Sequence, residues 1–384
     1  MSEHPERAEM EAPYMEEDEY ALRDELLALY EQEGVDGVLG GPLDLRSVAG
    51  CRALVLLGQE LRFVDPDRSA AFVACAEHLA SRLRPGDLGE RELEDLRCEM
   101  ALELVWAWID LKRLRDAEAA LGLAAERFIK GTRGHVLKGR FLDTWAVLHG
   151  NQGDFDKARQ AARAALACYE RAGERHFQGR ILFRLSIIEE HSGDEARMEE
   201  SLRLVVEALA RLDAAWEPDL YLSAVHQRVA CLIDLGRYRE ARVRLFESLG
   251  HYQEHGGVLD ELQRAMLEGL TNARLGKPHA AQRELIAALF GLRAAGESYT
   301  FGLLALELCA LYCEEDLAAE VRAGALKIIP VFQLQPLPPG GQKALLYLEL
   351  TLQDGLPDAA LLRHVARYLR ELLHDPDARF RPRD

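Results

Sequence analysis

The chain has 384 residues and a formal net charge of −18, with 48% hydrophobic and 29% charged residues. This balance is ordinary for a folded protein, but so acidic a chain would repel a phosphate backbone or an anionic bilayer, so we expect neither nucleic acid nor a membrane as partner. No apolar run reaches the roughly 18 to 20 residues that span a bilayer, and the acidic N-terminus lacks the apolar core of a signal peptide. We therefore expect a cytoplasmic protein.

The N-terminal quarter of the chain predicts a tail followed by irregular helices. Residues 1–15 mix acidic residues with prolines and are expected to be a disordered acidic tail. Residues 16–89 are expected to form N-terminal helices that act as a degenerate repeat or a cap, with a helix at about 16–32 that ends before Gly34 and two more near 44–64 and 66–84. Asp65 and Pro66 supply the cap and the first turn of the last helix.

From residue 90 to residue 329 the sequence repeats with a period of about 40. Each copy predicts a helix, a short turn, a bulky residue and then a small residue three positions later. Abundant Ala, Leu, Glu and Arg favour helix over strand, so we predict an all-α fold, an α–α superhelix of about seven to nine helix hairpins. The small residues are Ala117, Ala158, Ala241, Ala281 and Ala319, with Ser201 near the same slot of a degenerate copy.

The residues of these copies resemble the tetratricopeptide-repeat family. The clearest copy has a bulky and a small residue in its first helix (Trp145, Ala146), a glycine and an aromatic at the turn (Gly153, Phe155), and Ala158 in its second helix. The period is longer than is usual for the family, so the chain looks most like its divergent, long-helix bacterial members, which are regulators and sensors. The resemblance implies a packing pattern and carries no catalytic activity with it.

After the repeats, the composition changes. Residues 330–341 are rich in Pro and Gly and predict a break between helices. Residues 342–384 are expected to hold two capping helices, near 342–353 and 357–373, and a tail. In the second capping helix one face is an apolar stripe and the other carries Arg363, Arg367 and Arg370.

The sequence offers only weak signals for chemistry. Cys309 and Cys313 lie four residues apart, as two metal ligands might, but no His or carboxylate pair accompanies them, so buried core thiols are the favoured interpretation. His149 and His255 each precede a glycine, as in caspase-like proteases, yet every cysteine lies in a helical pattern that provides no oxyanion hole. We expect no metal, no cofactor and no enzymatic activity.

Candidate binding residues follow from the resemblance, which implies that a few slots of each first helix line a concave groove. Arg140 and Arg180 would be neighbours on one line, where they could hold a carboxylate or an acidic peptide. Two alternatives stay open: these arginines pair with local acids, or the register is wrong by one residue. The candidate groove residues are Arg140, Asp143, Arg180, Phe183, His226, Gln263 and Met266. The full lines are Glu99, Arg140, Arg180, Ser223 and Gln263, beside Leu102, Asp143, Phe183, His226 and Met266.

Three functions are compatible with this pattern. The leading hypothesis is a non-catalytic scaffold or adaptor that binds a protein or peptide in a bacterial regulatory or assembly system. The second is a ligand- or peptide-sensing regulator whose output lies on a partner chain. The third is a recruiting subunit of an enzyme complex, and self-association is compatible with all three.

Overall fold

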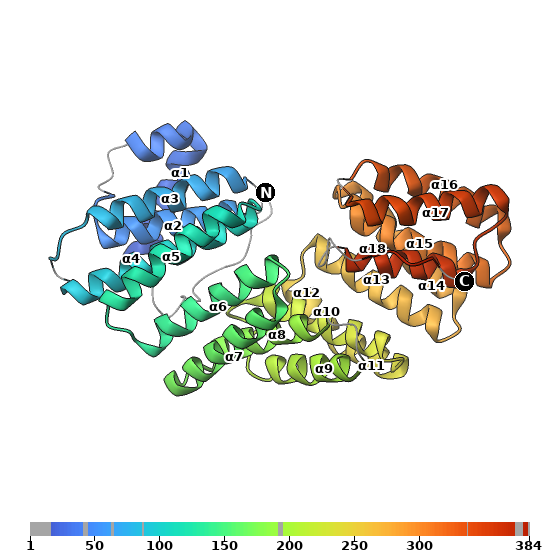
Figure 1. The fold of residues 1–384 in the computed structure, drawn as a ribbon. Coiled ribbons are helices and arrows are strands. Elements are labelled where there is room, and N and C mark those ends of the chain that lie inside the picture. Colours follow the sequence, from blue (N-terminus) through green and yellow to red (C-terminus); the bar gives the residue numbers. More distant parts are fainter. Residues whose placement is uncertain are drawn as a thin grey trace. The chain divides into compact units, whose positions relative to one another are not determined.

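A computed structural model of the chain describes residues 17–40, 45–62, 65–86, 88–190, 195–335, 337–372 and 379–382. Within these ranges every regular element is an α-helix (Figure 1). None of the helices found there is long and apolar enough to cross a membrane. The all-α, hairpin-based fold class is therefore confirmed, whereas the expected tail at residues 1–15 lies outside the described residues.

The chain divides into two compact units: Met1–Leu185 with Arg211–Trp216, and Ser186–Ala210 with Glu217–Asp384. The first unit contains α1 (Glu17–Gly40), α2 (Val48–Leu61), α3 (Pro66–Arg82), α4 (Glu90–Asp110), α5 (Leu114–Lys130), α6 (His135–Asn151) and α7 (Phe155–Ala172). The boundary falls within α8 (Arg175–Glu190). The second unit contains α9 (Glu195–Leu209), α10 (Pro218–Asp234), α11 (Tyr238–Glu247), α12 (Leu249–His255), α13 (Val258–Arg274), α14 (Pro278–Ala294), α15 (Ser298–Glu314), α16 (Ala318–Gln333), α17 (Pro339–Asp354) and α18 (Ala359–Glu371).

Local sequence signals set several helix ends. Asp65 accepts a hydrogen bond from the backbone N–H of Arg68 at the start of α3, as the sequence predicts. The first helix differs from its prediction, because α1 is kinked at Gly34, which has φ 69°, and helical turns resume beyond it. A glycine adopts this left-handed conformation without steric cost, so the chain bends there rather than leaving the helix.

The turns within the hairpins share one backbone requirement. The residue two positions before the second helix has a left-handed φ in five hairpins. Three of these residues are Gly153, Gly236 and Gly276, and the other two are Lys112 and Asp316, both with φ 58°. Side-chain-bearing residues rarely adopt this region, so the hairpin geometry is imposed by packing and not by turn chemistry alone.

A small residue is buried at the fourth position of the second helix in most hairpins. Ala117, Ala158, Ala241 and Ala281 are each 0% exposed, and Ser201 fills the same slot in its degenerate copy at 0%. The assignment of Ala319 to this slot is wrong. Ala319 is exposed, whereas Val321 is 1% exposed and lies 40 residues after Ala281, because α16 begins only at Ala318.

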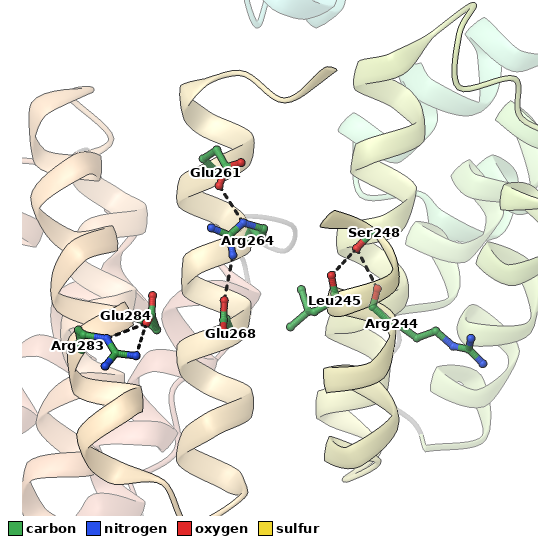
Figure 2. A network of polar contacts seen from close by, with 8 residues as sticks. All are labelled: Arg244, Leu245, Ser248, Glu261, Arg264, Glu268, Arg283 and Glu284. Atoms are coloured by element: carbon green, nitrogen blue, oxygen red, sulfur yellow. Dashed lines mark hydrogen bonds and ion pairs between the residues drawn. The ribbon is translucent and has the colours of Figure 1, made fainter. Parts of the chain in front are cut away.

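Two helix boundaries in the second unit differ from the boundaries predicted from the sequence. The Ser248 hydroxyl donates to the carbonyls of Arg244 and Leu245, at 2.9 and 3.0 Å, where α11 gives way to α12 (Figure 2). The predicted break at 330–341 is shorter than expected, because α16 runs through Pro330 to Gln333 and α17 already begins at Pro339. Pro330 lies in the last turn of α16, where a missing N–H donor disturbs few of the hydrogen bonds of the helix.

The last capping helix, and not the one before it, packs against the first helix of the preceding hairpin. Helix α18, not α17, makes the extensive contact with α15, so α18 occupies the place beside the first helix of the preceding hairpin. Its apolar stripe is buried as the pattern predicts: Leu361, Val365, Tyr368 and Leu372 are all between 0 and 8% exposed. The basic stripe of α18 is therefore presented beside α15.

The same substitution is expected to have opposite effects at two helical glycines of the first unit. A Cβ on Gly139 would lie 2.7 Å from the ring of Tyr169, which is 1% exposed, whereas a Cβ on Gly122 meets nothing within 4 Å. Gly139→Ala should lower the free energy of unfolding by about 1–3 kcal/mol through overpacking. Gly122→Ala should raise it by about 0.5–1 kcal/mol. Chemical denaturation of both variants tests this, and changes of the same sign would contradict the packing described.

Candidate binding faces of the two units

Arg140 is paired with acids of the preceding hairpin. Its Nη2 donates to Oε1 of Glu103 at 2.8 Å, and its Nη1 lies 3.6 Å from Oε1 of Glu99. Desolvation by the surrounding protein lowers the pKa of Arg140, but the two carboxylates outweigh it and raise the pKa above its ordinary value. Of the alternatives left open by the sequence, pairing with local acids thus describes Arg140.

Asp143 is buried beside Arg184. Its side chain is 8% exposed and accepts hydrogen bonds from Nε and Nη2 of Arg184. The Arg184 guanidinium also lies over the ring of Trp106, 5.4 Å from its centroid, and Arg62 lies at the same distance from that ring. The Trp106 indole N–H donates to the Thr144 hydroxyl at 3.2 Å. One tryptophan therefore joins charged side chains from several helices of the first unit.

The pKa of Tyr169 is affected by both candidate arginines of the first unit. Burial is the main cause of its raised pKa, Asp143 raises it further, and Arg140 and Arg180 both lower it, so both arginines lie near its hydroxyl. Phe183 is half-buried on α8, one helix along. The first unit thus gathers four of the seven candidate residues, with acids and bases interleaved.

The other three candidates lie in the second unit, where His226 belongs to the core. Its side chain is 8% exposed and its ring stacks on Tyr252 with centroids 5.4 Å apart. Burial lowers the pKa of His226 to about 4, against opposing effects of Asp260 and Gln263, so the imidazole is neutral at ordinary pH. Gln263 is exposed on α13, and Met266 is half-buried against the core.

Arg264 covers the neighbouring tyrosine. Its Nε donates to Glu261 at 2.8 Å and its Nη1 to Glu268 at 2.9 Å (Figure 2). Its guanidinium lies 5.9 Å from the centroid of the Tyr252 ring. Because Glu261 and Glu268 already accept hydrogen bonds from Arg264, its guanidinium cannot bind a further carboxylate through two unoccupied N–H groups.

Three exposed charged residues of the second unit, Asp234, Arg367 and Arg370, were not among the candidates predicted from the sequence. Asp234, at the end of α10, reaches solvent, yet desolvation raises its pKa above the ordinary aspartate value. Arg370 and Arg367 of α18 oppose this effect, while Glu190 and Glu307 add to it. We call these five residues the inner face of the second unit.

Two of the basic residues on this side are already neutralised. Arg363 donates to Glu314 at 2.7 Å and lies 3.6 Å from Glu307, which Arg274 also approaches at 3.6 Å. Asp234, Arg367 and Arg370 form no ion pair or hydrogen bond with any side chain of the described segments. The basic stripe of the last helix was visible in the sequence, but its acidic counterpart on α10 was not, because seven helices separate them along the chain.

The cysteines and acids give no metal site in the part of the chain that the structure describes, where no group of three potential ligands gathers. Cys309 is buried, which raises the pKa of its thiol to about 12, and the Cys313 thiol donates to the carbonyl of Pro357 at 3.3 Å. Cys309 therefore agrees with the core-thiol interpretation, whereas Cys313 is only half-buried.

Several solved structures are similar to this chain over most of its length. The chain superposes on a Rap protein crystallised with the competence and sporulation factor, with a TM-score of 0.58 and 14% identity, covering 86% of this chain and 91% of that one. The chain has the tetratricopeptide-like fold of the Rap proteins. Aspartyl phosphate phosphatase F from Bacillus subtilis matches with a TM-score of 0.56 and 14% identity, over 84% of this chain and 86% of that one. The apo quorum sensor NprR from B. thuringiensis matches with a TM-score of 0.52 and 12% identity, over 93% of this chain and 97% of that one. No protein-family model and no curated protein sequence matches the chain.

Removing the acid at position 143 should destabilise the first unit. Asp143→Asn keeps the shape but leaves Arg184 without its charged partner in a partly buried position, which should lower the free energy of unfolding by about 1.5–3 kcal/mol. Asp156→Asn is the matched control, because the Asp156 side chain, which pairs with Arg159, is itself 93% exposed. Thermal and urea unfolding should separate the two, and equal effects would argue against a structural role for the Asp143 pair.

Proposed function

We propose that this chain is a regulatory scaffold that binds a short peptide along the inner face of its second unit and acts through a partner chain. The observation that carries the proposal is that Arg367 and Arg370 of α18 act on the charge of Asp234 on α10, although none of the three forms an ion pair with a side chain of the described segments. Charges of both signs that lie near one another without pairing suit a ligand that carries both signs.

A peptide meets this requirement with its own chemistry. An ammonium group, from its N-terminus or a lysine, would pair with Asp234, where Glu190 adds further negative potential. A carboxylate, from its C-terminus or an acidic side chain, would accept forked hydrogen bonds from Arg367 and Arg370. The Rap protein of similar fold was crystallised with the competence and sporulation factor, which supports a ligand of this class without identifying it.

Binding of this kind would bias the curvature of the unit. Seven helices, α11 to α17, separate α10 from α18 in the chain, so a ligand that touches both favours conformations in which α10 and α18 are close. A partner that binds one curvature better than the other would then sense the ligand. The candidate residues Arg140, Asp143, Arg180 and Phe183 take no direct part in this proposal, because the charges of the first unit are balanced among themselves.

The proposal assigns the chain no catalysis of its own. One protein of similar fold is described as an aspartyl phosphate phosphatase, and that activity is a property of that protein. A recruiting subunit of an enzyme complex would use the same peptide-binding step and would differ only in what its partner does. The peptide site is therefore the first element to test.

A peptide library should reveal the charge pattern of the ligand. We expect the full chain to retain, from a library of random hexapeptides, sequences with a cationic group towards one end and a carboxylate towards the other. Asp234→Asn should remove the preference for the cation, and Arg367→Gln with Arg370→Gln the preference for the carboxylate, each with about a tenfold loss of affinity. Arg115→Gln, at an exposed position of α5 in the first unit, is the control. Retention without charge preference, or preferences unchanged in the variants, would refute the inner-face site.

The affinity for such a peptide should depend on pH. The pKa of Asp234 is raised mainly by desolvation, so in the free protein the carboxyl takes up its proton at a higher pH than an ordinary aspartate. A cationic group binds the ionised form, so affinity should be constant well above that pKa and should fall as the pH drops through it. Titration calorimetry of a selected peptide between pH 7 and pH 4 measures this. Asp234→Asn should flatten the profile, and a persistent profile would assign the titration to another group.

A further inference from the structure

An exposed apolar residue recurs on the outer helices of the second unit. It lies five positions after the buried small residue and is spaced by 40 residues in each case. These residues are Val206 on α9, Phe246 on α11, Ile286 on α14 and Leu326 on α16, which are 48%, 75%, 37% and 54% exposed. We call them the outer ladder.

The ladder points away from the core. On α14 the buried residues Ala281, Leu285, Ala288 and Leu292 mark the packed face. At 100° per residue, Ile286 is turned roughly 130° from the centre of that face. Phe290, one turn further on, is 71% exposed and faces outward as well. Equivalent positions of successive repeats fall on the same side of a stack, so the four residues follow one side of the unit.

The fold does not require apolar residues in this slot. In the first unit the same slot, five residues after Ala117 and Ala158, is occupied by Gly122 and Arg163, and both are exposed. Single exposed apolar residues are ordinary on protein surfaces. Four in one register, confined to the repeats of one unit, are a regular feature that packing leaves unexplained.

The ladder has a basic surround in an acidic chain. An arginine lies one turn before each rung: Arg203, Arg242, Arg283 and Arg322. Arg242 and, beside Leu326, Lys327 have no ion pair from their side chains within the described segments. Arg322 donates only to the carbonyls of Leu352 and Gly355. The neighbouring acids Glu247 and Glu284 are already engaged by Arg244 and Arg283.

We propose that the outer ladder is a docking surface for an acidic amphipathic helix of a partner protein. Such a helix would place apolar side chains on the ladder and carboxylates beside Arg242, Arg322 and Lys327. A second copy of this chain fits less well, because face-to-face pairing would bring these cations against one another. The surface is separate from the inner face, so its test does not depend on the peptide proposal.

Two defined peptides test the surface directly. The probe is a fluorescein-labelled helix of about 20 residues with Leu along one face and Glu on the rest, and its counterpart has Lys in place of Glu. Fluorescence anisotropy with the full chain should show binding of the Glu peptide, weakened by added salt, and at least tenfold weaker binding of the Lys peptide. Equal binding of the two peptides, or no binding of the Glu peptide, would overturn the proposal.

Variants locate the binding. Phe246→Ser with Ile286→Ser removes two apolar rungs without changing the charge of the surface and should weaken binding of the Glu peptide at least tenfold. Ile129→Ser changes an apolar residue that is 60% exposed on α5, outside the ladder, and is the control, which should bind as the unaltered chain does. Equal loss in both variants would refute the location.

Sedimentation velocity of the unaltered chain and binding to anionic vesicles complete the test. A dimer that the ladder variant dissociates, or vesicle binding that it abolishes, would give the surface to a second copy or to a bilayer instead.

Discussion

The close approach of the two helices in each hairpin is the constraint on which the rest of the structure depends. A buried small side chain allows the second helix to lie against the first, and where both helices must approach still further the chain uses glycine facing a ring or a leucine. Gly139 lies against Tyr169, Gly302 against Phe332 and Gly269 against Leu285, with an added Cβ within 2.7 Å in each case. Interiors at this density fix the rotation of each helix about its axis, and that rotation decides which residues face inward, sideways and outward.

The fold was predictable from sequence because this constraint is local and repeats. Between residues 90 and 329 the small-residue slot could be located in all but one of the copies, and the failure at Ala319 has a simple cause: two alanines precede Val321, and pattern alone prefers the smaller residue. Pro330 misled for a related reason, since a proline ends most helices but is tolerated in a last turn. Both errors concern the ends of elements and leave the order of helices intact.

The candidate site was less predictable, because charge pairing is decided between helices. The sequence placed Arg140 on an inner line but could not show that Glu103, 37 residues earlier, would neutralise it. It placed His226 on the neighbouring line, where the structure stacks it on Tyr252 in the core. The effect of Arg370 on Asp234 joins the last helix to α10, a proximity that no single repeat encodes.

The constant repeat spacing in the second unit determines which insertions and deletions would preserve its packing. From Ser201 through Ala241 and Ala281 to Val321, equivalent slots are 40 residues apart, whereas Ala117, Ala158 and Ser201 are separated by 41 and 43. An in-frame duplication or deletion of 40 codons between those later slots would keep every buried, inner and outer position in phase. The same event between the earlier slots would leave one or three residues out of phase, which a turn would have to absorb. One repeat length therefore keeps the phase throughout the later slots, whereas the earlier slots require a different length for each copy.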